Sequence, residues 1–263
     1  MAIVNLTPDS FYAASRNLTI DDVCRSVERA HAGGATIIDL GGYSSRPGAD
    51  DVSVEEEVSR VMMGMEAVQR VGCNVVVSVD TFRADVVRRV FDAYGAFIVN
   101  DISAGEADKD MITTVAECQL PYVAMHMRGT PTTMQSMTEY DEGVVDSVVD
   151  YFVRRTAELH AAGISRERLI LDPGFGFAKS VEQNYQLLAK LDALRALGYP
   201  LLVGVSRKSM IYKPLGISPE DALPGSLALA WEALRGGSAI IRVHDVEATH
   251  QVVQLSNLFK ASR

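Results

Sequence analysis

Cysteine is scarce in this chain of 263 residues, which has only Cys24, Cys73 and Cys118. Their number is odd and no two of them form a C-x-x-C pair, so we expect neither a disulfide framework nor a zinc site, and we expect a cytoplasmic protein. Long apolar runs are also absent. No stretch approaches the roughly 18 residues that cross a bilayer, so we expect no membrane partner.

Positive charge is in short supply as well. Lysine and arginine number 25 against 34 aspartates and glutamates, which gives a formal net charge of −9. This balance argues against nucleic acid as a partner. A small anionic ligand would need a local cluster of cations. The chain also lacks a G-x-x-x-x-G-K-[ST] loop, a G-x-S-x-G elbow and an H-E-x-x-H pair, and the segment 174–177 (GFGF) lacks the spacing of a dinucleotide fingerprint.

What the chain does contain is eight short apolar runs, and almost every one ends in a polar or glycine-rich cluster. Helical patterns lie between the runs. One helical pattern begins at Asp21, and another follows a capping-box pattern at Ser53 and Glu56. Further helices are predicted over 83–94, 108–118, 143–162, 181–191, 224–235 and 246–260. This alternation predicts an α/β fold with a single (β/α)₈ TIM barrel over residues 1–263. An open doubly wound sheet is the alternative. Long loops are expected at the C-terminal face of the barrel, at 6–20, 41–52, 127–142 and 206–222.

Asp80, Asn100 and Asp172 each end a different predicted strand. Any one of them alone could cap the helix that follows, because Asp and Asn favour that position. Three on separate strands instead favour one pocket of hydrogen-bonding groups. Such a pocket suits a flat, nitrogen-rich heterocycle, and it discriminates strongly because a wrong ligand leaves buried groups unpaired.

Cations gather in the same region of the predicted barrel. Arg46 lies in a glycine-bounded loop, Lys208 follows the seventh strand, and Arg242 and His244 end the eighth. The loops after strands seven and eight form a recurrent phosphate site in such barrels. Weak surface salt bridges are the alternative for these residues. Their position at strand ends favours an anion site.

Eight segments, taken in order along nearly the whole chain, resemble dihydropteroate synthase. They are 5–11 (NLTPDSF), 41–48 (GGYSSRPG), 78–81 (SVDT), 100–103 (NDIS), 125–131 (MHMRGTP), 172–177 (DPGFGF), 206–209 (SRKS) and 242–246 (RVHDV). The resemblance departs from the family pattern in the second loop. There Tyr43 replaces a glutamate and Ser45 replaces a threonine.

The resemblance implies that the chain condenses 6-hydroxymethyl-7,8-dihydropterin pyrophosphate with p-aminobenzoate, giving 7,8-dihydropteroate and pyrophosphate for folate synthesis. It assigns the pterin to Asp80, Asn100, Asp172 and Lys208. It assigns the pyrophosphate to Asn5, Arg46, Arg242 and His244, with Mg²⁺ bound at Asn5. It assigns p-aminobenzoate to Phe11, Ser45, Pro47, Phe177, Lys208 and Ser209.

An S_N1-like course is implied, with Asp80, Asp172, Lys208, Arg242 and His244 as the catalytic set. The resemblance also implies inhibition by sulfonamides, a homodimer formed through the last two helices near Trp231, and a further segment upstream of Met1.

Two rival functions share the predicted pocket. The pterin-binding domain of a corrinoid methyltransferase would not need the cations at 206–209 and 242–244, nor the loop motif at 5–11. A pterin-binding paralogue without synthase activity is favoured only by Tyr43. Binding of the pterin without turnover would identify the paralogue.

Overall fold

The structure is a computed structural model that describes residues 1–7, 19–43, 52–130 and 133–262. Its strands are parallel, and neighbours along the chain are neighbours in space. The first six form one sheet in the order β1 to β6, and β7 pairs with β8. The strands are β1 (Ala2–Asn5), β2 (Ile37–Gly41), β3 (Val76–Asp80), β4 (Ile98–Asp101), β5 (Tyr122–Met125), β6 (Leu169–Asp172), β7 (Leu202–Val203) and β8 (Ile240–Ile241).

Two isolated parallel bridges join the two sheets into a ring. Leu171 of β6 pairs with Leu201 just before β7, and Ala2 of β1 pairs with Val243 just after β8. At the second junction, Ile3 N donates to Val243 O at 3.0 Å and Val243 N donates to Met1 O at 3.0 Å. The predicted (β/α)₈ barrel is therefore confirmed, and the open doubly wound sheet is excluded.

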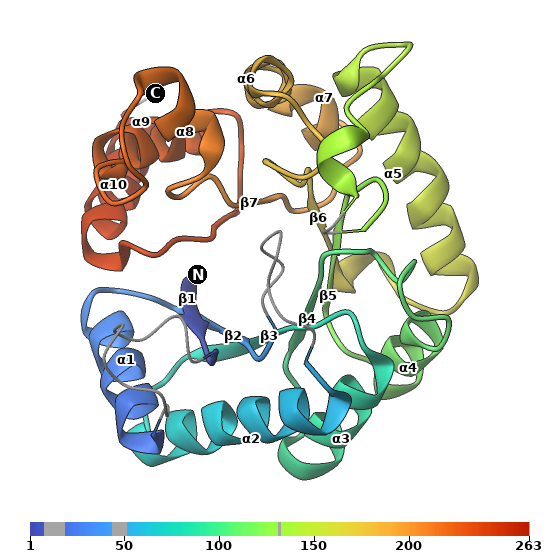
Figure 1. Ribbon diagram of the computed structural model, residues 1–263, viewed down its shortest axis with the longest axis vertical. Helices are drawn as coiled ribbons and strands as arrows, with labels where there is room; N and C mark the ends of the chain where they lie inside the picture. Colours follow the sequence, from blue (N-terminus) through green and yellow to red (C-terminus); the bar gives the residue numbers. More distant parts are fainter. Residues whose placement is uncertain (8–18, 44–51, 131–132, 263) are drawn as a thin grey trace.

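Helices surround the ring of strands, as Figure 1 shows. They are α1 (Ile20–Ala32), α2 (Val54–Val71), α3 (Ala84–Tyr94), α4 (Met111–Cys118), α5 (Val144–Ala161), α6 (Val181–Ala189), α7 (Leu191–Arg195), α8 (Ser209–Leu215), α9 (Leu223–Arg235) and α10 (Val246–Ala261). Short 3₁₀ turns occur at Met134–Ser136 and Arg166–Arg168. The helices predicted from periodicity are all present, but two short helices were not predicted. The segment of α8 was expected to be a loop, and α7 begins at Leu191, where the predicted helix over 181–191 was expected to end.

Helix starts follow the local capping chemistry. Ser53 caps α2, because its side chain accepts a hydrogen bond from Glu56 N at 3.1 Å. The reciprocal half of the predicted box is not formed there. The Glu56 carboxylate accepts instead from Arg60 Nε at 2.9 Å. A complete capping box forms at α1, where Thr19 and Asp22 each bond the other's backbone N–H.

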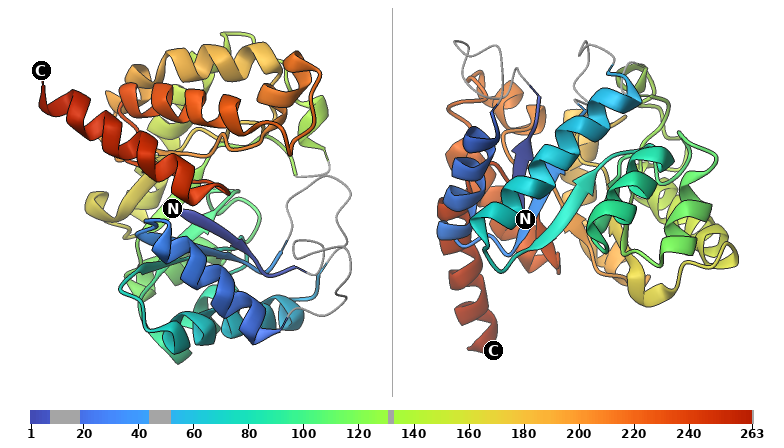
Figure 2. Two further views of the ribbon diagram at one scale, coloured as in Figure 1. Left: turned by 90° about the vertical axis from the view of Figure 1, so that its left-hand side faces the viewer. Right: turned by 90° about the horizontal axis from the view of Figure 1, so that it is seen from below.

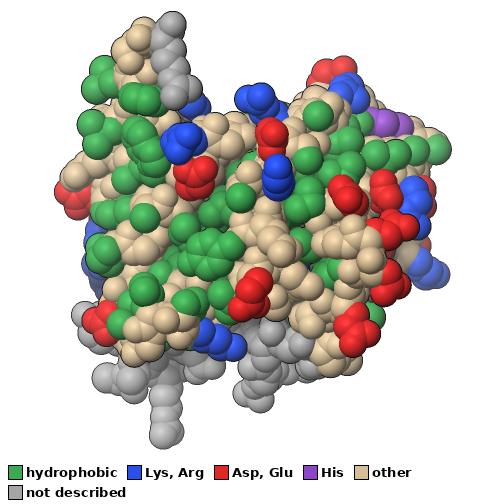
Figure 3. All heavy atoms as spheres, turned by 90° about the horizontal axis from the view of Figure 1, so that it is seen from above, with side chains coloured by type: hydrophobic (Ala, Val, Ile, Leu, Met, Phe, Trp, Pro, Cys, Tyr) green, Lys and Arg blue, Asp and Glu red, His purple; other side chains and the backbone are tan. Residues whose placement is uncertain are grey.

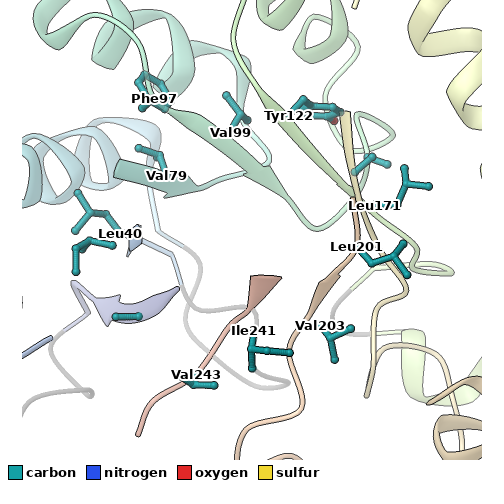
Figure 4. Packing of buried hydrophobic residues seen from close by; sticks show 14 of the residues in the cluster. Leu40, Val79, Phe97, Val99, Tyr122, Leu171, Leu201, Val203, Ile241 and Val243 are labelled. Atoms are coloured by element: carbon teal, nitrogen blue, oxygen red, sulfur yellow. The ribbon is translucent and has the colours of Figure 1, made fainter. Parts of the chain in front are cut away.

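The apolar core has two layers, separated by the two-residue period of the strands. Side chains on the outer side of the ring pack against the helices, as Figure 4 shows for Val99, Tyr122 and Leu171. A smaller cluster comes only from the strands and the residues beside them. It contains Ile98, Val123 and Leu202, packed by Met1, Ile37, Ile170 and Ile240. This cluster fills the lower part of the barrel interior and sets the register for the residues above it.

The C-terminal end of α10 projects beyond the rest of the molecule (Figure 2). Leu258 on this helix is 70% exposed, and Leu255 and Phe259 are also exposed. Figure 3 shows hydrophobic side chains on the projecting element at its upper left. Phe259 packs on Trp231 of α9, with the ring centroids 5.8 Å apart. In the part of the chain that the structure describes, no helix is both long and apolar enough to cross a membrane.

Candidate active site

A polar layer lies directly above the apolar cluster inside the barrel. Ile37, Ile98 and Ile240 belong to the apolar layer, and two positions further along the same strands are Asp39, Asn100 and Arg242. Residues two apart on a strand face the same side. The change from apolar to polar along the strands therefore builds a hydrogen-bonding site at the C-terminal mouth of the barrel, where sites of this fold lie.

Arg242 is held between two carboxylates. Its Nε donates to Asp39 Oδ2 at 2.6 Å, and its terminal nitrogen donates to Asp80 Oδ2 at 2.6 Å. Asp39 is fully buried and has two further partners. Ser78 Oγ donates to Asp39 Oδ1 at 2.6 Å, and Asn100 Nδ2 donates to Asp39 Oδ2 at 3.2 Å. Five residues from β2, β3, β4 and the end of β8 therefore form one network.

Burial governs the charges in this network. Loss of water raises the pKa of Asp80 to about 7, an effect that Arg242 opposes and that the nearby charges of Asp39 and Glu57 reinforce. Burial disfavours the charge of Arg242, but the two aspartates outweigh it and raise the pKa of Arg242 overall. A carboxylate whose pKa lies near neutrality is typical of a functional site.

Asp172 and Lys208 lie on the other side of the mouth. Asp172 ends β6 and is buried, and its Oδ1 accepts a hydrogen bond from Gly174 N at 2.8 Å. Burial raises the pKa of Asp172, while Lys208 opposes the shift. Burial lowers the pKa of Lys208 to about 8, and Asp172 opposes that shift. Lys208 Nζ donates to Phe175 O and lies 5.0 Å from the centre of the Phe177 ring.

Two glycines of the mouth show which side chains lie beside one another. A Cβ atom added at Gly41 would lie 3.6 Å from Asn5 Oδ1 and 3.9 Å from Asp80 Oδ2. A Cβ atom added at Gly204 would lie 3.8 Å from both Arg242 Cβ and Lys208 Nζ. Asn5 therefore shares the mouth with Asp80, and Lys208 shares it with Arg242.

The oxygen atoms near Gly41 are suited to a magnesium ion that is held by few protein ligands. Within the described residues, no group of three or more His, Cys, Asp or Glu side chains is arranged to hold a metal. Mg²⁺ prefers oxygen ligands and is usually bound by one or two protein oxygens together with substrate phosphates and water. Asn5 Oδ1 meets that requirement, since it lies beside Gly41, as the Asp80 carboxylate does.

The alternative interpretation of Asp80, Asn100 and Asp172 as helix caps is wrong. The residues at the N-caps of the following helices are Arg83 for α3, Asp110 for α4 and Ser180 for α6. The three strand-end residues are separated from these helices by loops, and their side chains are left to the barrel mouth.

His244 and Arg207 mark the rim after β8 and β7. Both Arg242 and His244 lie just beyond β8, which ends at Ile241. His244 is exposed, and its Nδ1 lies 3.1 Å from Ser206 Oγ. Arg207 makes a two-pronged ion pair with Asp245, through contacts of 2.8 Å and 2.7 Å. Arg207 thereby links the two loops. Its φ of 55° places it in the left-handed region, next to Lys208.

The remaining predicted residues divide into two groups. Phe177 lies in the loop after β6, and Ser209 is the half-buried first residue of α8. Four predictions fall outside the described residues, so the structure does not place them: Phe11, Ser45, Arg46 and Pro47.

Tyr43, the departure in the second loop, packs at the start of α3. Its ring meets Phe82 edge to face, with centroids 5.1 Å apart, and the Arg83 guanidinium lies 5.2 Å from the centre of the Tyr43 ring. Arg83 is itself paired with the buried Glu57 at 2.9 Å. A carboxylate at position 43 would have offered Arg83 an ionic contact, and the tyrosine offers a cation–π contact instead.

Sequence reasoning missed Asp39 and Lys179. Asp39 stands inside an otherwise apolar strand, two positions before the strand ends at Gly41. A search for polar residues at strand ends does not find Asp39. A carboxylate within an apolar run still indicates a buried ionic partner, because carboxylates are almost never fully buried unless they are paired. Lys179 is 5% exposed and contacts the loop that carries Phe177.

A cavity of about 780 Å³ lies away from this network, between α5 and the segment that follows β5. Charged side chains of both signs line it, among them Arg128, Asp150 and Arg155. The lining of this cavity includes none of the aspartates of the barrel mouth, so we do not assign the candidate active site to it. The polar strand residues that converge at the barrel mouth make the mouth the candidate site.

Comparison with known proteins identifies the family. The family described as pterin binding enzyme matches residues 1–244. The dihydropteroate synthase of Escherichia coli (strain K12) is 44% identical over 255 residues, which cover 97% of this chain and 89% of that protein.

Two solved structures extend the comparison to the fold. The Yersinia pestis dihydropteroate synthase with a sulfonamide drug has a TM-score of 0.92 at 39% identity, covering 99% of this chain and 93% of that one. The Xanthomonas albilineans dihydropteroate synthase in complex with 7,8-dihydropteroate has a TM-score of 0.87 at 36% identity, covering 99% and 92%. On its sequence, its fold and the polar mouth of its barrel, the chain belongs to the dihydropteroate synthase family of pterin-binding enzymes.

Proposed function

We propose that this chain, a transferase of folate biosynthesis, joins 6-hydroxymethyl-7,8-dihydropterin pyrophosphate to p-aminobenzoate at the mouth of its barrel. The products are 7,8-dihydropteroate and pyrophosphate. The observation that carries the proposal is the network of Asp39, Asp80, Asn100 and Arg242 beside Asp172 and Lys208. We further propose a single domain over residues 1–263, which the family match over residues 1–244 supports.

The pterin is bound, in this proposal, by Asp80, Asn100, Asp172 and Lys208. Asp172, which is buried, and Asp80, which is half-buried, accept hydrogen bonds from the amino and ring N–H groups of the heterocycle, while the amide and the ammonium donate to its carbonyl and ring nitrogen. This set of groups makes the choice of ligand strict, because a ring without matching donors would leave acceptor oxygens of the two carboxylates without a ligand partner. Their raised pKa values support this role, because they indicate desolvated carboxyls with capacity to accept.

The leaving group is bound by Arg242 and His244 at the end of β8, with Arg46 from the second loop. Arginine binds phosphate oxygens through two parallel hydrogen bonds. Asn5 would supply an oxygen ligand to Mg²⁺, and the ion would neutralise charge that grows on the departing pyrophosphate. The cations of this chain act in the same sense, because fixed positive charge at a developing anion is usually the largest catalytic contribution.

The carbon–oxygen bond then breaks before the new carbon–nitrogen bond is complete, in an S_N1-like course. Positive charge develops on the methylene carbon, and Asp80 and Asp172 lie where their negative charge offsets it. The amine of p-aminobenzoate attacks this carbon and then loses a proton. No side-chain nucleophile is needed. We assign p-aminobenzoate to Phe177, Lys208 and Ser209, together with Phe11, Ser45 and Pro47 of the two loops.

We propose a homodimer formed through α9 and α10. The exposed Leu255, Leu258 and Phe259 on α10, next to Trp231, support this assignment because such apolar groups favour burial in an interface. A cytoplasmic location stays a prediction.

Chromatographic detection of 7,8-dihydropteroate tests the proposed reaction. The purified chain should form this product only when the pterin pyrophosphate, p-aminobenzoate and Mg²⁺ are all present. A sulfonamide should raise the apparent KM for p-aminobenzoate and leave the limiting rate unchanged. Tight binding of the pterin with no product would instead identify a paralogue without synthase activity.

A further inference from the structure

Lys179 is a buried cation whose contacts are all neutral. It follows the turn 174–177 and is 5% exposed. Its Nζ donates to Gly174 O at 3.0 Å and to Phe177 O at 3.0 Å, and lies 3.0 Å from Nδ1 of the buried His126. An ammonium group has three N–H donors and no acceptor. The three contacts therefore use its full donor capacity.

A role in stability alone explains this lysine poorly. A buried cation surrounded by neutral groups costs free energy, and an apolar side chain of similar length would fill the same space without that cost. Burial lowers the pKa of Lys179 to about 7, while the charge of Asp172 opposes the shift. The geometry of its contacts indicates a function for Lys179 other than stability.

The two carbonyls that Lys179 binds lie at the start and the end of one turn. Phe177 N also donates to Gly174 O at 3.1 Å, so the turn is closed from inside by backbone and side chain together. Gly174 connects Lys179 to Asp172 through two hydrogen bonds. Its carbonyl accepts from Lys179, and its N–H donates to Asp172 Oδ1 at 2.8 Å. Only one residue thus separates the ammonium group from the carboxylate that ends β6.

The same turn carries two other parts of the barrel mouth. Phe175 O accepts the hydrogen bond of Lys208, and the Phe177 ring lies 5.0 Å from Lys208 Nζ. On its outer side, Lys179 meets His126 at the end of β5, and His126 N donates to Asp172 O at 2.9 Å. Lys179 therefore connects β5, β6 and the turn at one point.

We propose that Lys179 is a positioning residue: through Gly174 O and Phe177 O it fixes the turn that aims Asp172 at the pterin and Phe177 at p-aminobenzoate. The proposal rests on the assignment of Asp172 to the pterin made above. Lys179 itself touches neither substrate.

The test is equilibrium binding of two probes, 6-hydroxymethylpterin and inorganic pyrophosphate, to the full-length chain. Lys179→Met removes all three donors and keeps the length of the side chain. It should weaken binding of the pterin by about tenfold or more, because a buried hydrogen bond to a charged group is lost on each carbonyl. It should also raise the KM for p-aminobenzoate. Pyrophosphate binding should stay unchanged, because the cations after β8 do not depend on the turn.

Thr156→Val is the matched control. Thr156 is a buried polar residue of α5 whose hydroxyl donates to Phe152 O at 2.7 Å, so its loss lowers stability without touching the mouth. If Lys179→Met and Thr156→Val lower the melting temperature alike and neither changes pterin binding at a temperature where both are folded, Lys179 has only a structural role and the proposal is overturned. If Lys179→Met does not fold, Lys179→Gln replaces it. An amide retains a donor but no charge, so it should give an intermediate pterin affinity, and a wild-type affinity would overturn the proposal.

Asp172→Asn separates this proposal from the assignment on which it rests. If Asp172→Asn leaves pterin binding unchanged, the assignment of Asp172 fails. If Asp172→Asn weakens binding but Lys179→Met does not, only the role of Lys179 fails. If Lys179 acts through Asp172, the two losses combine to less than their sum in the double variant, because one residue then depends on the other.

Discussion

Asp39 joins residues that the proposed reaction uses for the two parts of one substrate, the pterin and its pyrophosphate. It binds Arg242, assigned to the pyrophosphate, and Asn100, assigned to the pterin. At the residue scale, the site therefore depends on a carboxylate that is fully buried and lies beneath both groups. Its charge holds the guanidinium in the barrel before any ligand arrives.

Asp39→Asn should remove that charge with little change of shape. We expect the free energy of unfolding to fall by about 3 kcal/mol, because Arg242 would lose one of its two carboxylate partners in a buried site and keep only Asp80. Ser78→Ala is the control, since it deletes only a neutral hydroxyl that donates to Asp39 and should cost about 1 kcal/mol. Urea denaturation of both variants measures the difference. Equal losses would mean that the charge of Asp39 does not hold Arg242.

Lys208 should make the reaction sensitive to alkaline pH. Burial lowers its pKa to about 8, so the protonated fraction, and with it kcat/KM for the pterin pyrophosphate, should fall as the pH rises through that value. Asp80, with a pKa raised to about 7, should produce the rising limb, because the carboxylate is the form that accepts hydrogen bonds. The kcat/KM profile reports these groups in the free enzyme.

Lys208→Arg tests which residue produces the falling limb, since a guanidinium stays charged throughout. The limb near pH 8 should disappear in this variant even if the maximal rate is lower. A limb that persists at the same pH would assign it to another group.

The polar site residues at strand ends could be predicted from the sequence, whereas the contacts between their side chains could not. Asp80, Asn100 and Asp172 stand out because each follows an apolar run. Asp39 interrupts such a run, and the contact between Arg242 and Asp39 spans 203 positions of the chain. A contact between residues so far apart in the chain depends on closure of the ring of strands. Local sequence patterns do not predict that closure.

Among the elements, the turn between β6 and α6 is tightly constrained. Gly174 has a φ of 69°, and a Cβ atom there would lie 2.0 Å from His126 O. Both the backbone conformation and the close approach of β5 therefore require glycine at this position.

Gly174→Ala should lower the free energy of unfolding by about 3 kcal/mol or more, from left-handed strain together with a backbone clash. Gly72→Ala is the matched control. Gly72 has a φ of 66°, and nothing lies within 4 Å of the added Cβ, so strain alone should cost about 1–2 kcal/mol. Thermal unfolding of the two variants checks the difference. Similar losses would show that the turn moves away from β5 at little cost.

Helix α8 shows why a short element was not predicted. It has only seven residues and contains Pro214, so its pattern resembles a loop. The structure starts α8 at Ser209, immediately after Lys208, whose N-cap backbone is extended with φ −79° and ψ 160°. Longer helices such as α2 and α5 were predicted because periodicity over several turns is a strong signal.

At the scale of the whole molecule, the ring of strands and the projecting α10 have separate roles. The ring brings its polar residues to one mouth, while α10 presents Leu255, Leu258 and Phe259 to the outside. The proposed homodimer would bury this surface and leave the mouth of each barrel to its own chain.

Leu258→Glu should weaken the dimer by at least about tenfold in dissociation constant, because it removes a buried leucine from the proposed interface and places a charge there. Activity per chain should be retained under conditions where the variant is folded. Val153→Glu, at an exposed position on α5, is the control and should leave the dimer intact. Analytical ultracentrifugation measures both. A monomeric wild-type chain, or a dimer unaffected by Leu258→Glu, would exclude this interface.

In the proposed site, the barrel mouth has a pterin side at Asp172 and a pyrophosphate side at Arg242. Calorimetric binding of 6-hydroxymethylpterin and of pyrophosphate with Mg²⁺ tests it most directly, with Asp172→Asn and Arg242→Lys as the variants. Arg242→Lys keeps a positive charge between Asp39 and Asp80 but loses the fork that binds two oxygens. We predict that Asp172→Asn weakens binding of the pterin only and that Arg242→Lys weakens mainly binding of pyrophosphate, each by about tenfold or more. Equal weakening of both ligands by both variants would contradict the division.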